Sequence, residues 1–265
     1  GDKVEGWAQI FDDETYSKVE DVSISDVGRD FVGWTSMLDG NEIPHSEMHE
    51  WLEDTVRTIV ESGEVGNVVE IGTGSGMILF NLQDHFKTYI GVDPSSTAVR
   101  FVNRALRGKA HLVDRVDVRV GTATDISKFG HIQPDLFIIN SVAQYFPSGE
   151  YLANTIRAAI DLCGGRPSRM FLGDIRSLAL SDTFFLSYAA HQLRSEGAPL
   201  SPDRLVHRAR ILFESHTELL VHPAFFFDLQ RACKSISHVE ILPKRMVAKN
   251  ELSQYRYQVL LHFND

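Results

Sequence analysis

A glycine-rich segment directly after a short apolar run is the part of this sequence with the clearest chemical meaning. Val68–Ile71 leads into Gly72–Gly76, and apolar residues then recur at helical spacing from Met77 onward. In a strand, glycine turn and helix, the backbone can approach a nucleotide-like ligand closely, and the free N–H groups of the helix can face its anionic group. We therefore expect a nucleotide-containing cofactor to bind at Gly72, Thr73, Gly74 and Gly76.

The spacing and the flanking residues of this loop discriminate between ligands. A Walker loop requires Gly-Lys-Ser/Thr, but Met77 follows Gly76, and a dinucleotide loop would place its third glycine one residue later. Glu70 lies two positions before the first glycine, where a carboxylate would repel a pyrophosphate and attract an ammonium group. The methionine part of S-adenosylmethionine (SAM) carries such an ammonium. The loop therefore favours SAM, whose product after methyl transfer is S-adenosylhomocysteine.

Three further predicted strand ends carry groups that suit the rest of SAM. A carboxylate at Asp93 can accept hydrogen bonds from two ribose hydroxyls, and the small residues Gly121–Ala123 leave room for adenine. A tight turn without a ligand is the simple alternative for a lone glycine loop. It fits poorly here, because ligands of open α/β sheets bind at these carboxyl ends. The expected cofactor-binding set is completed by Asp93, Pro94, Ser95, Gly121, Thr122, Ala123, Asn140, Ser141 and Val142.

The elements that must position these residues alternate between strand and helix patterns, which predicts an α/β fold with a mostly parallel sheet. Short apolar runs are typical of strands buried on both faces. The final two predicted strands lie close together in sequence, which favours a last strand that inserts antiparallel. The seven predicted strands cover residues 67–71, 88–93, 115–120, 135–140, 170–174, 236–242 and 255–263.

Four regions follow from this pattern. Residues 1–66 form an N-terminal helical cap, and residues 67–180 form the Rossmann-like cofactor-binding core. Residues 181–235 form a helical insertion between the fifth and sixth strands, a candidate substrate lid, and residues 236–265 supply the final two strands. Within the cap we expect a helix over Glu47–Ser62 with Ser46 as N-cap and Gly63 as stop, and Trp34 and Tyr16 either cover the cofactor or pack against the core.

Composition excludes several partners. The net charge is -10 and no cluster of Lys and Arg is interleaved with aromatics, so nucleic acid is not expected. No apolar run approaches the roughly 18 residues that span a bilayer, and Gly1–Trp7 has no targeting core, so no membrane is expected. Two distant cysteines, Cys163 and Cys233, favour a reducing cytoplasm. His45 and His49 have zinc-like spacing but no third ligand, so no metal is expected.

Six segments resemble one known family. They are Asp30–Gly40, Val69–Leu82, Asn140–Ser148, Gly173–Ser177, Val239–Lys244 and Asn250–Tyr257. Together they resemble the methyltransferase domains embedded in nonribosomal peptide synthetases, which make natural products. The resemblance extends from about Trp7 to His262, and Asn140–Ser148 is its most specific part.

This resemblance implies an activity and its partners. It implies a class I, SAM-dependent N-methyltransferase with a Rossmann-like fold, and the chain would be one module of a longer protein. The substrate would be the α-amino group of an aminoacyl thioester on the phosphopantetheine of a carrier (thiolation) domain. An adenylation domain would belong to the same polypeptide.

Methylation of nitrogen requires a free amine, and we expect positioning rather than a strong base to dominate. Asn140 is expected to accept a hydrogen bond from the amine, and Tyr145 to donate or accept beside it. Asp174 would attract the amine as a cation and take its proton, while Arg176 orients Asp174 or a substrate carbonyl. In the insertion, Glu218 and His222 would share a helix face and close over the site. The expected catalytic set is Asn140, Tyr145, Asp174, Arg176, Glu218 and His222.

Other readings stay open at this stage. Asp174 and Arg176 are equally compatible with a structural ion pair, and Asn140 is compatible, to a lesser degree, with a strand cap. Glu218 and His222 fit surface positions somewhat better than a role in the site. Transfer to carbon or oxygen of a carrier-bound acyl group is an alternative, and carbon methylation would need a base such as His222 with Glu218. A SAM-binding domain that serves as an inactive scaffold is a third reading.

Overall fold

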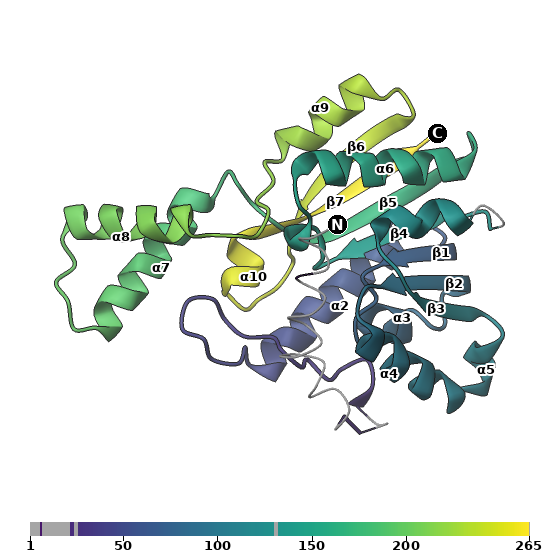
Figure 1. Cartoon of the computed structure of the whole chain (residues 1–265), viewed down its shortest axis with the longest axis horizontal. Coiled ribbons are helices and arrows are strands. Elements are labelled where there is room, and N and C mark those ends of the chain that lie inside the picture. The colour runs from purple at the N-terminus through teal and green to yellow at the C-terminus, as the bar shows by residue number, and fades with distance from the viewer. Residues whose placement is uncertain (1–5, 7–21, 24–25, 130–131, 265) are drawn as a thin grey trace.

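Seven strands form one mixed sheet in the order β3-β2-β1-β4-β5-β7-β6 (Figure 1). The structure is a computed structural model that describes residues 6, 22–23, 26–129 and 132–264. The first five strands run parallel, and β7 inserts antiparallel between β5 and β6. The predicted fold and the antiparallel last strand are confirmed. The strands are β1 (Gly66–Ile71), β2 (Phe86–Asp93), β3 (Val116–Val120), β4 (Leu136–Asn140), β5 (Ser168–Arg176), β6 (Ile236–Pro243) and β7 (Arg256–Phe263).

Helices cover both faces of the sheet, and β4 and β5 are therefore buried along their whole length. One apolar core lies between the sheet and α6 (Gly149–Cys163), η4 (Ala123–Phe129) and α9 (Ala224–Ala232). The other core lies beneath α2 (His45–Glu61) and α4 (Ser96–Arg107). The remaining elements are α3 (Met77–Asn81), α5 (Ala110–Val113), η5 (Ala143–Tyr145), α7 (Ser181–Ser195), α8 (Pro202–Glu214) and α10 (Glu251–Gln254).

The helix expected over Glu47–Ser62 exists, but its start differs. It begins at His45, with Pro44 at the N-cap and no side-chain cap, so Ser46 is inside the first turn. Proline is well placed before a first helical turn because its fixed φ suits this position and it has no N–H group to satisfy. This helix, α2, buries Trp51 and Leu52 and thereby ties the preceding segment to the sheet.

The insertion is not helical throughout, which corrects the expectation for residues 181–235. Helices α7 and α8 form a hairpin that projects from the body of the molecule, and α9 packs near β6 (Figure 1). Between α8 and α9 the chain runs extended, and Val221 forms a parallel bridge with Ser177. Hydrogen bonds from Val221 N to Arg176 O (2.9 Å) and from Leu219 N to Gln144 O (2.7 Å) hold this segment against the sheet. Within the described residues, no helix combines the length and the apolar character needed to cross a bilayer.

Candidate active site

A cavity of about 330 Å³ lies at the carboxyl ends of β1, β2 and β4. The strand order reverses between β1 and β4, and this is the switch point at which open α/β sheets bind ligands. We call the part of the cavity that is lined by the residues expected to bind SAM the cofactor end, and the rest the acceptor end. The cofactor end is lined by Glu70–Ser75, Asp93–Ser95, Gly121–Ala123 and Asn140–Val142, and the acceptor end by Trp34, Met37, Trp51, Gln144, Tyr145, Glu218 and Arg256.

The glycine loop forms the floor of the cofactor end. Gly72 has φ +81°, and a Cβ there would lie 2.2 Å from Cγ2 of Val142. Only glycine fits this backbone at so close an approach. Gly72 N donates to Val92 O (2.7 Å), which fixes the loop against the end of β2. All four predicted loop residues contribute to the turn, although Gly76 lies just beyond the cavity wall as the N-cap of α3.

Glu70 lies at the base of this loop with 1% of its surface exposed. Tyr89 donates a hydrogen bond from its hydroxyl to Oε2 of Glu70 at 2.7 Å. Burial, reinforced by the nearby charge of Asp93, raises the pKa of Glu70 to about 8, although the Tyr89 bond opposes the shift. The protein thus holds a proton on this carboxyl at neutral pH, and an arriving ammonium would favour its release.

Asp93 is held by the backbone at the end of β2. Gly74 N donates to Oδ2 (2.8 Å) and Ser95 N donates to Oδ1 (2.8 Å), so the carboxylate links the glycine loop to the start of α4. Ser95 caps that helix by accepting from Ala98 N at 2.9 Å. A carboxylate can accept about four hydrogen bonds, and these two backbone donors fix its orientation.

The third and fourth strands complete the cofactor end. Thr122 N donates to Oδ2 of Asp125 (2.8 Å), which shapes the turn of small residues after β3. Ser141 has φ +57° and donates from Oγ to Oδ2 of Asp174 at 2.6 Å. Oδ1 of Asn140 is buried, and a Cβ at Gly173 would lie 2.0 Å from it. The glycine therefore gives the Asn140 amide its space, and Oδ1 is buried there without a hydrogen-bond partner among the described residues.

The residues present fit SAM. A cradle that a Cβ would fill, an oriented carboxylate at Asp93 and a buried carboxyl at Glu70 match the backbone approach, the ribose hydroxyls and the ammonium in turn. All the predicted cofactor-binding residues except Gly76 line the same cavity. Their individual contacts with SAM remain predictions.

Asp174 lies one layer behind the acceptor end. Its side chain is 0% exposed and does not line the cavity. Besides Ser141, it accepts from Arg256 Nη1 (2.6 Å) and Trp51 Nε1 (3.4 Å). Burial alone would raise the pKa of Asp174, but the charges of Arg256 and Lys244 and the Ser141 bond lower it overall. A buried carboxylate held in this way positions its three neighbours and is a poor proton acceptor.

In the structure, Arg176 does not contact Asp174, which it was expected to orient. Arg176 contacts Glu218 Oε2 (2.5 Å) and His216 Nε2 (2.9 Å), whereas Arg256 is the arginine paired with Asp174. Arg176 lines a smaller neighbouring cavity rather than the main one. Side chains of β5 that differ by two in number point to the same face, but a register shift between Leu172 and Ile175 and the positive φ of Asp174 turn these two apart.

The expectation that Glu218 and His222 share a helix face is wrong. Both lie in the extended segment between α8 and α9, because that segment pairs with the chain beside β5 instead of closing on itself. Glu218 does line the acceptor end. His222 does not, and its Nδ1 accepts from Ala224 N at 3.1 Å near the start of α9.

Tyr145 lies where it was expected, on the wall of the acceptor end. Burial, together with the negative charge of Glu218, raises the pKa of its hydroxyl well above the usual range. The phenol is therefore neutral near pH 7 and serves as a hydrogen-bonding group.

The segment before α2 covers the acceptor end. Trp34 lines the cavity and its ring lies 4.5 Å from that of Trp51, while Tyr16 is outside the described residues. His45 and His49 pack edge-on against Phe31, with ring centroids 5.6 and 5.0 Å from it. Across the described residues, no group of three side chains is arranged to hold a metal ion.

Sequence reasoning missed Arg256, Trp51 and Gln144. The only signal for Arg256 was its place in the segment Asn250–Tyr257. There a capping box of Asn250 and Ser253 turns the chain sharply into β7 and presents Arg256 at the strand's start.

Residues 69–164 match the methyltransferase domain family, and almost the whole chain aligns with regions of much longer synthetases. The chain has the fold of class I SAM-dependent methyltransferases, and its residues 69–164 match a methyltransferase domain. It is 46% identical to beauvericin nonribosomal cyclodepsipeptide synthetase of Gibberella fujikuroi, over 99% of this chain and 8% of that protein. It is 45% identical to enniatin synthase of Fusarium equiseti, over 100% of this chain and 8% of that protein. It is also 45% identical to cyclosporin synthetase of Tolypocladium inflatum, over 99% of this chain and 2% of that protein.

These identities confirm the resemblance to the methyltransferase regions of nonribosomal peptide synthetases. The methyltransferase domain spans 2–8% of the length of these relatives. Its fold is similar to that of magnesium protoporphyrin IX methyltransferase from Synechocystis (TM-score 0.57, 12% identity, 98% of both chains). It is also similar to the N-methyltransferase NodS from Bradyrhizobium japonicum (TM-score 0.52, 15% identity, 83% of this chain and 98% of that chain).

Proposed function

We propose that this methyltransferase domain methylates the α-amino group of an aminoacyl thioester tethered to a carrier domain. The identity to cyclodepsipeptide and cyclosporin synthetases supports a carrier-bound amino acid as the substrate class. The same likeness supports an adenylation domain and a phosphopantetheine-bearing carrier domain as neighbours in one polypeptide.

The ionisable groups at the acceptor end favour methylation of nitrogen over methylation of carbon. They are Glu218, Tyr145 and Arg256, and no histidine among the described residues lines this cavity. Methylation of carbon requires an enolate and hence a well-placed base, and the expected partner His222 lies outside the cavity. An amine needs no such base, because its lone pair is available once it has lost one proton.

The energetics agree with positioning by this chain. An α-amino group has a pKa of about 7.7–8.0, so keeping it neutral near pH 7 costs only about 1 kcal/mol. Orientation of reacting groups can contribute on the order of 7–11 kcal/mol at its limit. Bound SAM supplies a methyl carbon on a sulfonium sulfur. Transfer of that methyl group would form a nitrogen–carbon bond in place of the carbon–sulfur bond, whose electron pair would stay on sulfur, and the amine would lose one proton.

Three residues that line the cavity have a task in this scheme. Glu218, anchored through Oε2 by Arg176, attracts the amine to the cavity and faces the proton that it releases. Tyr145 stays neutral and hydrogen-bonds beside it. Asn140 lines the same cavity, and its unpartnered Oδ1 can accept a hydrogen bond from the amine.

The test is the site of the new methyl group. The domain is mixed with SAM and aminoacyl thioesters of pantetheine, and fragment mass spectrometry locates the added methyl. We expect it on the α-nitrogen, with Glu218→Gln lowering kcat/KM by about tenfold as one charge-assisted contact is lost. A methyl group on carbon or oxygen would refute nitrogen transfer. SAM binding by calorimetry with no transfer to any thioester would favour the inactive scaffold.

A further inference from the structure

Arg256 is a buried cation at the acceptor end to which the scheme above assigns no task. It begins β7, and its side chain, 11% exposed, lines the cavity together with Glu218 and Tyr145. A nearly buried guanidinium at a cavity wall is costly unless it is compensated, so its partners indicate what it does.

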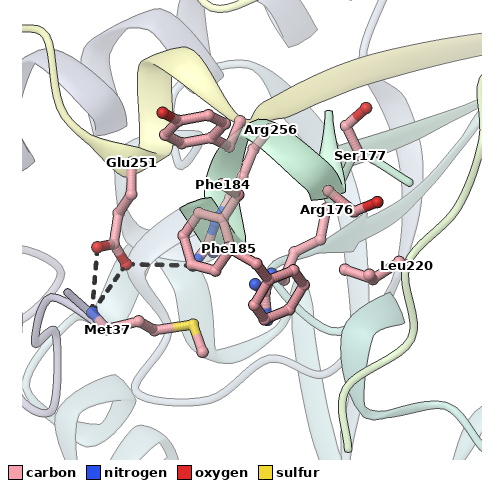
Figure 2. Close-up of a pocket in the computed structure, with 10 residues that line it drawn as sticks. Met37, Arg176, Ser177, Phe184, Phe185, Leu220, Glu251 and Arg256 are labelled. Carbon is pink, nitrogen blue, oxygen red and sulfur yellow. Dashed lines mark hydrogen bonds and ion pairs between the residues drawn. The ribbon is translucent and has the colours of Figure 1, made fainter. Parts of the chain in front are cut away.

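Two buried carboxylates hold this guanidinium. Nη1 of Arg256 donates to Oδ2 of Asp174 at 2.6 Å, and Nη2 lies 3.9 Å from Oε1 of Glu251. Glu251 also accepts from Ser36 Oγ (2.8 Å) and Met37 N (3.1 Å), which belong to the segment over the acceptor end. Figure 2 shows Glu251 placed between Met37 and Arg256. The guanidinium is therefore fixed in position before any substrate arrives.

The number of donors exceeds what these two contacts use. A guanidinium presents five N–H donors in a planar fork. Burial alone would lower the pKa of Arg256, but the charges of Asp174, Glu218 and Glu251 raise it overall, so the group stays charged. Arg256 lines the cavity, and its fork has more N–H donors than the contacts with Asp174 and Glu251 use.

Arg176 cannot take this role, although it was the arginine expected from sequence. Its Nη1 contacts both Glu218 and His216, and its guanidinium lies 5.0 Å over the ring of Phe184. In Figure 2 it lies with Phe184, Phe185 and Leu220 around the smaller cavity. Arg176 thus supports Glu218 from behind.

We propose that Arg256 binds the acyl carbonyl oxygen of the aminoacyl thioester while Glu218 receives its α-amino group, an inference that rests on the proposed function. An α-amino thioester presents a donor and an acceptor separated by only two carbons. A carboxylate beside a guanidinium, linked by charge as Glu218 and Arg256 are, is complementary to that pair. Holding both ends fixes rotation about the nitrogen–Cα and Cα–carbonyl bonds, so that the lone pair is aimed at the methyl carbon.

The experiment removes the guanidinium and the carbonyl separately. Arg256→Gln alone would leave Asp174 buried without its cation, so the test variant is Asp174→Asn with Arg256→Gln. Its matched control is Asp174→Asn alone, which keeps the guanidinium. Arg256→Lys, which keeps charge but loses the fork, is a second test, and Arg157→Gln on exposed α6 controls for loss of an arginine. Each is assayed with an aminoacyl thioester and with the matching thioether, in which CH2 replaces the carbonyl.

The expected result is specific to the carbonyl. On the thioester, the double variant should lose about 10–100-fold in kcat/KM relative to Asp174→Asn, and Arg256→Lys should lose less. On the thioether, the same proteins should agree within about threefold. Affinity for SAM and melting temperature should be the same for the double variant and its control.

Three outcomes would overturn the assignment of Arg256. These are an unchanged rate on the thioester, an equal loss on both substrates, or a loss of SAM affinity, which would indicate a role in the cofactor site. Failure of the proposed function looks different: the unmodified domain would then methylate neither substrate on nitrogen.

Discussion

Replacement of Glu70 by glutamine should stabilise the SAM-free methyltransferase domain, and increasingly so as the pH rises. Glutamine resembles the protonated carboxyl in shape and can still accept the hydrogen bond from Tyr89. The substitution removes a carboxyl group that is only 1% exposed and whose ionisation would therefore destabilise the folded state. The variant therefore isolates the free energy that this carboxyl imposes on folding.

The size of the effect follows from the two pKa values. The unfolded chain releases the proton above about pH 4.5, whereas the folded protein retains it until about pH 8. Between these values the folded state binds more protons than the unfolded state, so the free energy of unfolding falls as pH rises. At 1.36 kcal/mol per pH unit, the wild type should lose about 3 kcal/mol relative to Glu70→Gln between pH 4.5 and pH 7.

The assay is urea denaturation of both proteins at pH 5, 6, 7 and 8. Glu53→Gln, on the exposed face of α2, is the matched control and should track the wild type at every pH. A difference between Glu70→Gln and wild type that stays constant from pH 5 to pH 8 would refute the protonated carboxyl.

The same variant tests the link to SAM. If the ammonium of SAM meets an ionised Glu70, binding to the wild type must release a proton below pH 8, and affinity must rise with pH toward that value. Calorimetry in buffers of different ionisation enthalpy measures this release directly. Glu70→Gln should bind more weakly and release no proton, and proton release equal to that of the wild type would exclude the contact.

Three further changes test the rest of the site. Asp93→Ala should weaken SAM binding by about 10–100-fold in calorimetry, because it removes the ribose acceptor and frees two backbone N–H groups, and an unchanged affinity would reject this placement of the ribose. Gly72→Ala should lower the melting temperature far more than Gly164→Ala, since both have positive φ but only the first would drive a Cβ into Val142; equal effects would leave backbone strain as the sole cause. His222→Ala should keep kcat for methyl transfer within about twofold, because this side chain lies outside the cavity, and a large loss would restore it as a base.

The cofactor end was predictable because it depends on local sequence. A glycine turn, an acid before it and an acid at the next strand end are each read within a few residues, and a parallel sheet brings such ends together. Asp93 and Gly121–Ala123 therefore line one cavity although they are distant in sequence.

The acceptor end was less predictable because it depends on the register and on charges paired across the fold. Nothing near Asp174 in sequence indicates that its partner is Arg256, which lies 82 residues later in the chain on the neighbouring strand β7. The extended segment that carries Glu218 has apolar residues at spacings compatible with a helix, and tertiary hydrogen bonds to Arg176 and Gln144 overrule that pattern.

The position of the antiparallel strand β7 in the sheet also constrains the order in which this domain can fold during translation. β6 pairs with β7 and with no other strand of the sheet, so it has no edge to join until the chain beyond it has emerged. The buried carboxylate of Asp174 likewise has no paired arginine until Arg256, the first residue of β7, has been synthesised. The strands that carry the SAM-binding residues can thus fold while translation continues. The acceptor end is complete only after β7 has paired with β5 and β6. A chain whose translation stops before β7 would therefore have a cofactor pocket but no complete acceptor end.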